Sequence, residues 1–196
     1  MTPTASLTAT IVLAAGEGSR FGAPKQAALV DGRPMLTALL ERLAGGAPLP
    51  RVVVIGAHAE LLDGLVPTGE WSVVVNEDWA SGVGSSLRAG LAAVPNAEQV
   101  VVVLGDLAWL QAEAIERVMQ RAQVSDADVI RAFDGDLPGH PVLLRGPALL
   151  VARSQSAGEG MRFLINRFAV DRVDCDGLGV ATDVDEVEDL HKPQRW

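Results

Sequence analysis

The chain has 196 residues, 48% of them hydrophobic and 21% charged, which is the balance of a globular domain with a large core. Its formal net charge of −9 argues against a nucleic-acid partner, because a basic face could not easily outweigh it. Cys175 is the only cysteine, which excludes an internal disulfide framework and a cysteine zinc cluster. The first apolar run, residues 11–15, is too short for a signal peptide or a membrane span, so we expect a cytoplasmic protein without a membrane partner.

Valine-rich apolar runs alternate with helix-like segments along the chain. Strands are predicted at residues 10–13, 51–55, 71–75, 99–104, 127–132, 141–144 and 170–175, and helices at 34–43, 59–65, 85–93, 111–122, 147–152, 160–167 and 186–190. Continuous apolar runs such as VVVIG suit strands that are buried on both faces of a parallel sheet. The alternation predicts a three-layer α/β fold. Without a visible repeat or linker, we expect a single domain over residues 1–196, with residues 1–8 flexible.

Residues 11–26, IVLAAGEGSRFGAPKQ, form an apolar run that opens into a glycine-rich loop. The loop carries three glycines and two cations: Gly16, Gly18, Gly22, Arg20 and Lys25. Glycines let the main chain bend around an anion and point N–H groups at it, and the two cations add positive charge. The spacing fits neither the dinucleotide fingerprint nor the P-loop. The glycines alone leave a polyphosphate-binding loop and an ordinary tight turn both open.

Further polar segments follow predicted strands, and the carboxyl ends of parallel strands are where ligands collect in such folds. Asp106 ends the run QVVVVLG, where it either caps the next helix or binds Mg²⁺, which prefers one or two carboxylates. Asp183 and Asp185 alternate with Val184, so an extended segment would point both carboxylates the same way. Either one completes a metal site, with Asp185 preferred, or both belong to an acidic cluster at the start of the final helix.

Residues 13–25, LAAGEGSRFGAPK, closely resemble the signature of MobA-like nucleotidyltransferases. This group includes the molybdenum-cofactor guanylyl- and cytidylyltransferases, and more distant relatives activate sugar phosphates and methylerythritol phosphate. Residues 76–91 resemble the cytidylyltransferase-type branch, and residues 183–190 resemble the family's late acidic segment. Residues 105–109 resemble a Gly-Asp-x-Pro motif without its proline, and residues 139–141 match Gly-His-Pro. Residues 158–162 resemble a Gly-Asp-x-Gly-x-Arg turn that is one residue shorter and has Glu159 in place of aspartate.

The resemblance implies a Rossmann-like nucleotidyltransferase fold with a mostly parallel mixed sheet, and it assigns roles to particular residues. The implied catalytic residues are Arg20, Lys25 and Asp106, and the implied metal ligands are Asp106 and Asp185. The implied nucleotide-binding residues are Leu13, Ala14, Ala15, Gly16, Gly18, Ser19, Arg20, Lys25, Asn76, Ser81, Gly82, Ser85 and Ser86. Acceptor binding is assigned to His140 and Arg162, and Trp79 is expected in the pocket wall.

The reaction implied by the resemblance is transfer of a nucleoside monophosphate from a nucleoside triphosphate to a small phosphorylated acceptor, with Mg²⁺ as cofactor and pyrophosphate as product. Ala15 stands where the guanylyl branch has glycine, which favours a pyrimidine and hence CTP, although relatives with Ala-Ala-Gly also use UTP or dTTP. The match at residues 76–91 favours molybdopterin as acceptor, with a molybdenum enzyme as a possible partner. The alternatives are another phosphorylated acceptor or a non-catalytic protein that delivers nucleotide or cofactor. Some relatives are named as oxidoreductases, but no dinucleotide fingerprint supports that activity here.

Overall fold

A seven-stranded sheet forms the centre of the computed structural model, which describes residues 7–19 and 21–191. In spatial order the strands are β5 (Ser72–Val75), β4 (Arg51–Ile55), β1 (Thr8–Ala14), β6 (Gln99–Leu104), β8 (Leu137–Arg145), β7 (Val129–Asp134) and β9 (Val170–Asp174). Only β8 runs antiparallel to its neighbours in this sheet. The prediction of a mostly parallel mixed sheet in an α/β fold is therefore confirmed.

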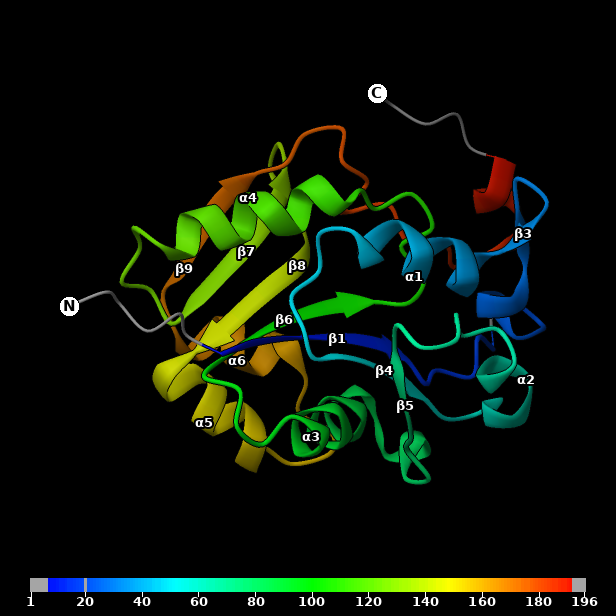
Figure 1. The fold of residues 1–196 in the computed structure, drawn as a ribbon, viewed down its shortest axis with the longest axis horizontal. Coiled ribbons are helices and arrows are strands. Elements are labelled where there is room, and N and C mark those ends of the chain that lie inside the picture. Colours follow the sequence, from blue (N-terminus) through cyan, green and yellow to red (C-terminus); the bar gives the residue numbers. More distant parts are fainter. Residues whose placement is uncertain (1–6, 20, 192–196) are drawn as a thin grey trace.

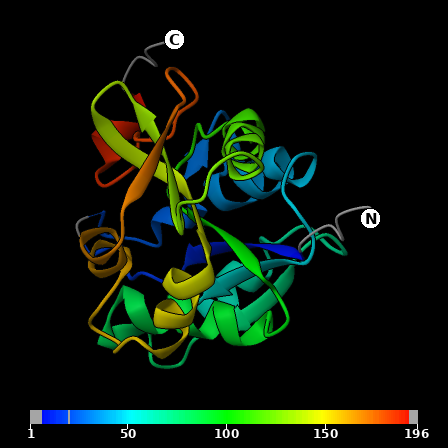
Figure 2. The ribbon, with the colours of Figure 1, turned by 90° about the vertical axis from the view of Figure 1, so that its left-hand side faces the viewer.

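Helices cover both faces of the sheet, because alternate side chains of the central strands are apolar in both directions. The views in Figures 1 and 2 place α1 (Met35–Ala44) and α4 (Ala112–Ala122) on one face. On the other face lie α3 (Val83–Ala93), α5 (Gly146–Ser154) and α6 (Met161–Arg167). The short helix α2 (Ala59–Asp63) adds Leu62 to the core on the α1 side. The result is the three-layer arrangement that the sequence predicts.

The structure differs from the sequence prediction mainly at the ends of elements. Strand β1 begins at Thr8, and the carbonyl of Leu7 accepts a hydrogen bond from the Glu98 amide at 2.9 Å, so the expected flexible segment does not extend to these two residues. Residues 1–6 lie outside the described part of the chain. Strand β8 begins at residue 137 rather than 141, because Leu137 pairs with Asp134 across a tight hairpin.

A small antiparallel ribbon, β2 (Leu29–Val30) and β3 (Arg33–Pro34), is an element that the sequence analysis missed. Its two-residue turn has positive φ at Asp31 (52°) and Gly32 (79°), as a tight hairpin turn requires. Three 3₁₀ turns complete the description: η1 (Lys25–Ala27), η2 (Trp79–Ser81) and η3 (Val187–His191). In Figure 1, η3 (red) lies beside the ribbon (blue), and a separate apolar cluster that includes Val30, Val184 and Leu190 joins the two regions.

Candidate active site

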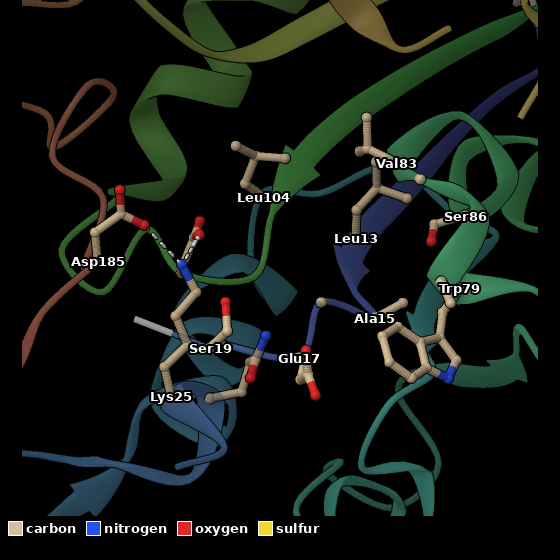
Figure 3. A pocket seen from close by; sticks show the side chains of 16 residues that line it. Leu13, Ala15, Glu17, Ser19, Lys25, Trp79, Val83, Ser86, Leu104 and Asp185 are labelled. Carbon is tan, nitrogen blue, oxygen red and sulfur yellow. Dashed lines mark hydrogen bonds and ion pairs between the residues drawn. The ribbon is translucent and has the colours of Figure 1, made fainter. Parts of the chain in front are cut away.

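A cavity of about 520 Å³ opens where β1 and β6 end, beside the start of α3 (Figure 3). Strands β4 and β6 flank β1 on opposite sides, and such a position is where open α/β sheets bind ligands. The cavity is lined by Leu13, Ala15, Gly16, Glu17, Gly18, Ser19, Lys25, Gln26, Trp79, Ala80, Gly82, Val83, Ser86, Leu104, Asp106 and Asp185. Segments far apart in the sequence therefore converge on one site.

Most of the predicted nucleotide-binding residues line this cavity. They are Leu13, Ala15, Gly16, Gly18, Ser19, Lys25, Gly82 and Ser86. Four others do not line it: Ala14, Asn76, Ser81 and Ser85. Arg20 lies outside the described residues. Trp79 is in the wall, as expected. Glu17, Gln26 and Leu104 also line the cavity but were not predicted, because their residue types carry no ligand-binding signal and only their positions in the fold place them there.

The glycine-rich loop owes its shape to Gly18. Its φ of +68° is left-handed, and a Cβ there would lie 3.0 Å from the carbonyl oxygen of Ala23 and 3.4 Å from Cγ of Lys25. A larger residue would be strained and would press on the segment that carries the lysine. The carbonyl of Gly18 also accepts a hydrogen bond from the Phe21 amide at 2.9 Å. The loop therefore turns tightly and delivers Lys25 into the cavity.

Asn76 supports the start of α3 instead of facing the cavity. Its buried Nδ2 donates to the hydroxyl oxygens of Ser85 at 2.8 Å and Ser86 at 3.0 Å. Oγ of Ser85 in turn lies 2.9 Å from the Asp78 carbonyl and 2.7 Å from the Gly82 carbonyl, and its single hydroxyl proton is shared between these two acceptors. The polar residues at the beginning of this segment thus orient Ser86, which is the member that reaches the cavity.

Lys25, Asp106 and Asp185 form an ionic cluster on one wall of the cavity. Figure 3 shows Lys25 and Asp185 pointing toward one another. Nζ of Lys25 donates to Oδ2 of Asp106 at 2.6 Å and to Oδ1 of Asp185 at 3.1 Å. Burial by itself would lower the pKa of Lys25, because it disfavours the charged ammonium. The two carboxylates outweigh this effect, and the pKa of Lys25 is raised. The ammonium is therefore fully charged near neutral pH and aimed into the cavity.

The C-terminal segment reaches the cluster through main-chain contacts. The amide of Val184 donates to the Asp106 carbonyl at 3.1 Å, and the Val184 carbonyl accepts from Lys25 Nζ at 3.0 Å. Oδ2 of Asp189 accepts from the amides of Asp185 and Glu186, both at 2.8 Å. These contacts explain why Asp185, rather than Asp183, meets the lysine. Asp183 remains outside the cavity lining, and partial desolvation with the nearby charges of Asp106 and Asp185 raises its pKa.

The two carboxylates are a suitable donor set for a hard divalent cation. Oδ1 of Asp106 is buried and has no hydrogen-bond partner among the described residues, which is costly for a carboxylate oxygen unless a ligand meets it. The described residues contain no group of three His, Cys, Asp or Glu side chains that could bind a metal by themselves. Mg²⁺ needs only one or two carboxylates when phosphate oxygens and waters complete its shell, so Asp106 and Asp185 fit this ion.

The turn after Asp106 carries Ala108 where the family motif has proline, and an arginine of α1 anchors it. Arg42 of α1 donates to the carbonyl oxygens of Ala108 at 2.8 Å and Leu110 at 3.3 Å. Burial lowers the pKa of Arg42. At the other end of the turn, the Gly105 amide donates to the Leu13 carbonyl at 2.8 Å. The arginine thus ties the turn to α1 where the family pattern has proline.

A second cavity of about 320 Å³ adjoins the first and shares Leu13, Val83 and Leu104 with it. His140 and Arg162, the two predicted acceptor-binding residues, both line this second cavity. His140 comes from β8, and its Nδ1 lies 3.1 Å from the carbonyl oxygen of Val102. Burial, together with the charge of Arg131, lowers the pKa of His140 to about 4. The two cavities therefore offer adjoining spaces for two ligands.

No helix within the described residues is both long and apolar enough to cross a lipid bilayer.

Comparison with known proteins identifies the family. Residues 10–173 match the model of the MobA-like NTP transferase domain. The chain is 30% identical over 191 residues to the nicotine blue oxidoreductase of Paenarthrobacter nicotinovorans, covering 93% of this chain and 94% of that protein. It is also 32% identical over 131 residues to the bifunctional protein GlmU of Sphingopyxis alaskensis, covering 64% of this chain but only 29% of that protein.

Among solved structures, Rv0371c from Mycobacterium tuberculosis H37Rv superimposes with a TM-score of 0.83 at 26% identity, covering 96% of this chain and 97% of that one. A second structure of Rv0371c, in complex with manganese, gives a TM-score of 0.79 at 25% identity, with 95% and 97% covered. The family match spans most of the chain, and its residues include the glycine-rich loop, Lys25 and Asp106. The chain therefore belongs to the MobA-like NTP transferase family and is a nucleotidyltransferase.

Proposed function

We propose that this nucleotidyltransferase transfers CMP from CTP to the phosphate of a small acceptor, with molybdopterin as the preferred candidate, and releases pyrophosphate. The observation that carries the proposal is the cluster of Lys25, Asp106 and Asp185 on the wall of a cavity that adjoins a second one. The first cavity takes the nucleoside triphosphate, and the second cavity takes the acceptor. We place the reaction in the cytoplasm.

The proposed reaction is a single displacement at the α-phosphorus. A phosphate oxygen of the acceptor forms a bond to this phosphorus while the bond to the bridging oxygen of the β-phosphate breaks, and pyrophosphate leaves with that oxygen. The protein aligns the two ligands and neutralises charge, and no covalent enzyme intermediate is required. Lys25 and Arg20 bind phosphate oxygens, and the amides of the loop around Gly16 and Gly18 add hydrogen bonds.

Asp106 and Asp185 would hold the divalent cation, which we take to be Mg²⁺. Bound there, the ion supplies Lewis-acid stabilisation of phosphate charge. The buried, unpartnered Oδ1 of Asp106 supports this assignment, and so does the manganese complex of Rv0371c. Among the predicted nucleotide-binding residues with polar side chains, Ser19 and Ser86 reach the cavity. Asn76 acts by holding Ser85 and Ser86 in place.

The preference for CTP rests on the packing around Ala15. This residue is 3% exposed and lines the first cavity together with Trp79. A Cβ on Gly56 would lie 2.9 Å from Cβ of Ala15 and 2.7 Å from Cβ of Trp79, so these side chains are packed tightly against the chain behind them. The methyl group of Ala15 has little room to retreat from a ligand. A smaller pyrimidine ring suits this space better than guanine.

The test is a panel of the four ribonucleoside triphosphates with Mg²⁺, scored by pyrophosphate release against molybdopterin and against sugar phosphates. We expect pyrophosphate with CTP and molybdopterin, and loss of most turnover in Lys25→Ala. Binding of CTP without pyrophosphate release would favour a delivery protein, and near-normal turnover of Lys25→Ala would refute the mechanism. Stabilisation by GTP but not by CTP in a thermal shift assay would refute the argument from Ala15.

A further inference from the structure

The second cavity is lined mainly by apolar side chains and has two polar ones. Its walls include Leu87, Met161 and the shared residue Leu104, and its two polar side chains are His140 and Arg162. Such a lining can bury an apolar body but can satisfy only a few polar groups. A polyol placed here would leave most of its hydroxyls without partners, which costs free energy for each buried group.

His140 is fixed by its strand and by the strand beside it. Its main-chain amide donates to the Val180 carbonyl at 2.8 Å, and Nδ1 lies 3.1 Å from the Val102 carbonyl of β6. A carbonyl oxygen can only accept a hydrogen bond, so Nδ1 carries the ring proton. The neutral ring then has its lone pair on Nε2. Burial and the charge of Arg131 lower the pKa to about 4, which keeps this tautomer neutral near pH 7.

With Nδ1 engaged by β6, Nε2 is the ring nitrogen that remains for a ligand in the cavity. Within the described part of the chain, no hydrogen bond to Nε2 of His140 is present. A neutral imidazole in this tautomer accepts a hydrogen bond at Nε2 and cannot donate one. It therefore pairs with an N–H or O–H group of a ligand and repels a ligand's own lone pairs.

Arg162 supplies the other polar end. It stands in the first turn of α6, is exposed, and makes no hydrogen bond or ion pair with any residue that the structure describes. Its guanidinium remains available for an anionic group at the mouth of the cavity. The cavity thus combines an acceptor nitrogen inside, apolar walls and a cation at the edge.

We propose that His140 is a specificity-determining residue, which selects acceptors whose body is mainly apolar and carries an N–H or O–H donor, and which rejects polyol phosphates. The proposal rests on the proposed function in one respect, namely that the second cavity receives the acceptor. It concerns the recognition of the acceptor's body by His140, and its tests do not require turnover.

The first test uses two probes that share one ring system. Lumazine is a bicyclic heteroaromatic with ring N–H donors, and in 1,3-dimethyllumazine methyl groups replace those donors. We expect the wild-type protein to bind lumazine at least about tenfold more tightly, because a site built to pair with a donor discriminates strongly against an analogue that lacks it. In His140→Phe the affinity for lumazine should fall to that for dimethyllumazine, whereas Leu137→Gln, at an exposed position of the same strand, should change neither.

Equal binding of the two probes by the wild type, or discrimination that persists in His140→Phe, would overturn the proposal. A second measurement needs no variant of uncertain stability. Nitrogen-15 NMR of the wild-type histidine ring should show the proton of His140 on Nδ1, and a proton on Nε2 would overturn the assignment. Glucose 1-phosphate should not bind to the second cavity, and its binding there would contradict the rejection of polyols.

The outcomes separate this inference from the proposed function. Histidine-dependent binding of lumazine without pyrophosphate release from any nucleoside triphosphate would sink the proposed reaction and support the recognition by His140. Pyrophosphate release with a polyol phosphate would support nucleotidyl transfer and overturn the selectivity inferred here.

Discussion

Replacing Lys25 with methionine should increase the affinity of the nucleotide-free protein for Mn²⁺. In the structure, Nζ of Lys25 occupies the position between Asp106 and Asp185, at 2.6 and 3.1 Å from their oxygens. A divalent cation bound by both carboxylates has to displace this ammonium. Methionine keeps the approximate length of the side chain and removes the charge, so no ammonium competes with the cation for these carboxylates.

The size of the effect follows from the two contacts. A hydrogen bond that involves a charged group contributes about 1.5–3 kcal/mol. The side chain of Asp106 is only 17% exposed, so its contact with Lys25 should contribute a free energy within this range. The contact with Asp185 counts less because that side chain is 45% exposed and solvent screens the interaction. A competing free energy of about 2 kcal/mol corresponds to roughly 30-fold in the dissociation constant.

The assay is a titration with Mn²⁺ followed by electron paramagnetic resonance, with and without CTP. We expect tighter binding in Lys25→Met without nucleotide, together with loss of most turnover. In the wild type, CTP should strengthen Mn²⁺ binding, because the triphosphate draws the lysine away, and this coupling should shrink in the variant. The control is Arg121→Met, which removes an exposed ion pair with Asp171 on another face. Unchanged or weaker Mn²⁺ binding in Lys25→Met would refute the reasoning.

Four further predictions follow from single contacts. Ala15→Gly should increase the affinity for GTP relative to CTP, as measured by calorimetry, because it removes the methyl group that restricts the base; an unchanged ratio would contradict this. Gly18→Ala should lower the free energy of unfolding by about 1–2 kcal/mol in denaturant titrations, since the alanine must adopt a φ of +68°, and an equally stable variant would show that the loop relaxes. Arg42→Met should cost about 2 kcal/mol of stability and reduce turnover, because the carbonyl of Ala108 loses its charged donor; full turnover would mean that the turn after Asp106 holds without it. His140 should bind a proton in the unfolded state near pH 6.5 but in the folded state only near pH 4, so its contribution to stability is complete above pH 6.5 and is lost progressively as the pH falls towards 4. His140→Gln should remove this part of the pH dependence, about 3 kcal/mol between pH 7 and pH 4, and unchanged slopes would contradict the lowered pKa.

The order and type of the main elements could be predicted because each central strand is a continuous apolar run. The run at residues 51–55 became β4 and the run at 99–104 became β6, with the predicted ends. The β2–β3 ribbon could not be predicted in the same way, since two-residue strands have no periodicity to detect. Its formation depends on the turn at Asp31 and on packing against the C-terminal segment.

Some parts of the candidate site could be predicted from the sequence, and others could not. The glycine-rich loop and Lys25 are contiguous in the sequence, so their spacing carried the signal. Asn76 and Ser85 were predicted as ligand-binding residues from their polarity and family position, but they lie outside the cavity lining, where Asn76 binds the hydroxyls of Ser85 and Ser86 and Ser85 binds main-chain carbonyls. Polarity indicates that a side chain needs a partner but not whether that partner is a ligand or another side chain.

By itself, the sequence determined the α/β class and the nucleotidyltransferase family, because these properties are encoded in local patterns, whereas phosphate binding by the loop at residues 11–26 stays a prediction. Only the tertiary structure decided which of two acidic residues, Asp183 or Asp185, joins Lys25. That choice depends on the contact of Val184 with the main chain of Asp106, between segments nearly 80 residues apart in the chain. It also decided that His140 presents a lone pair to a second cavity, because its tautomer is set by a carbonyl on the neighbouring strand β6. Contacts between distant segments have no local signature, and they determine the chemistry of this site.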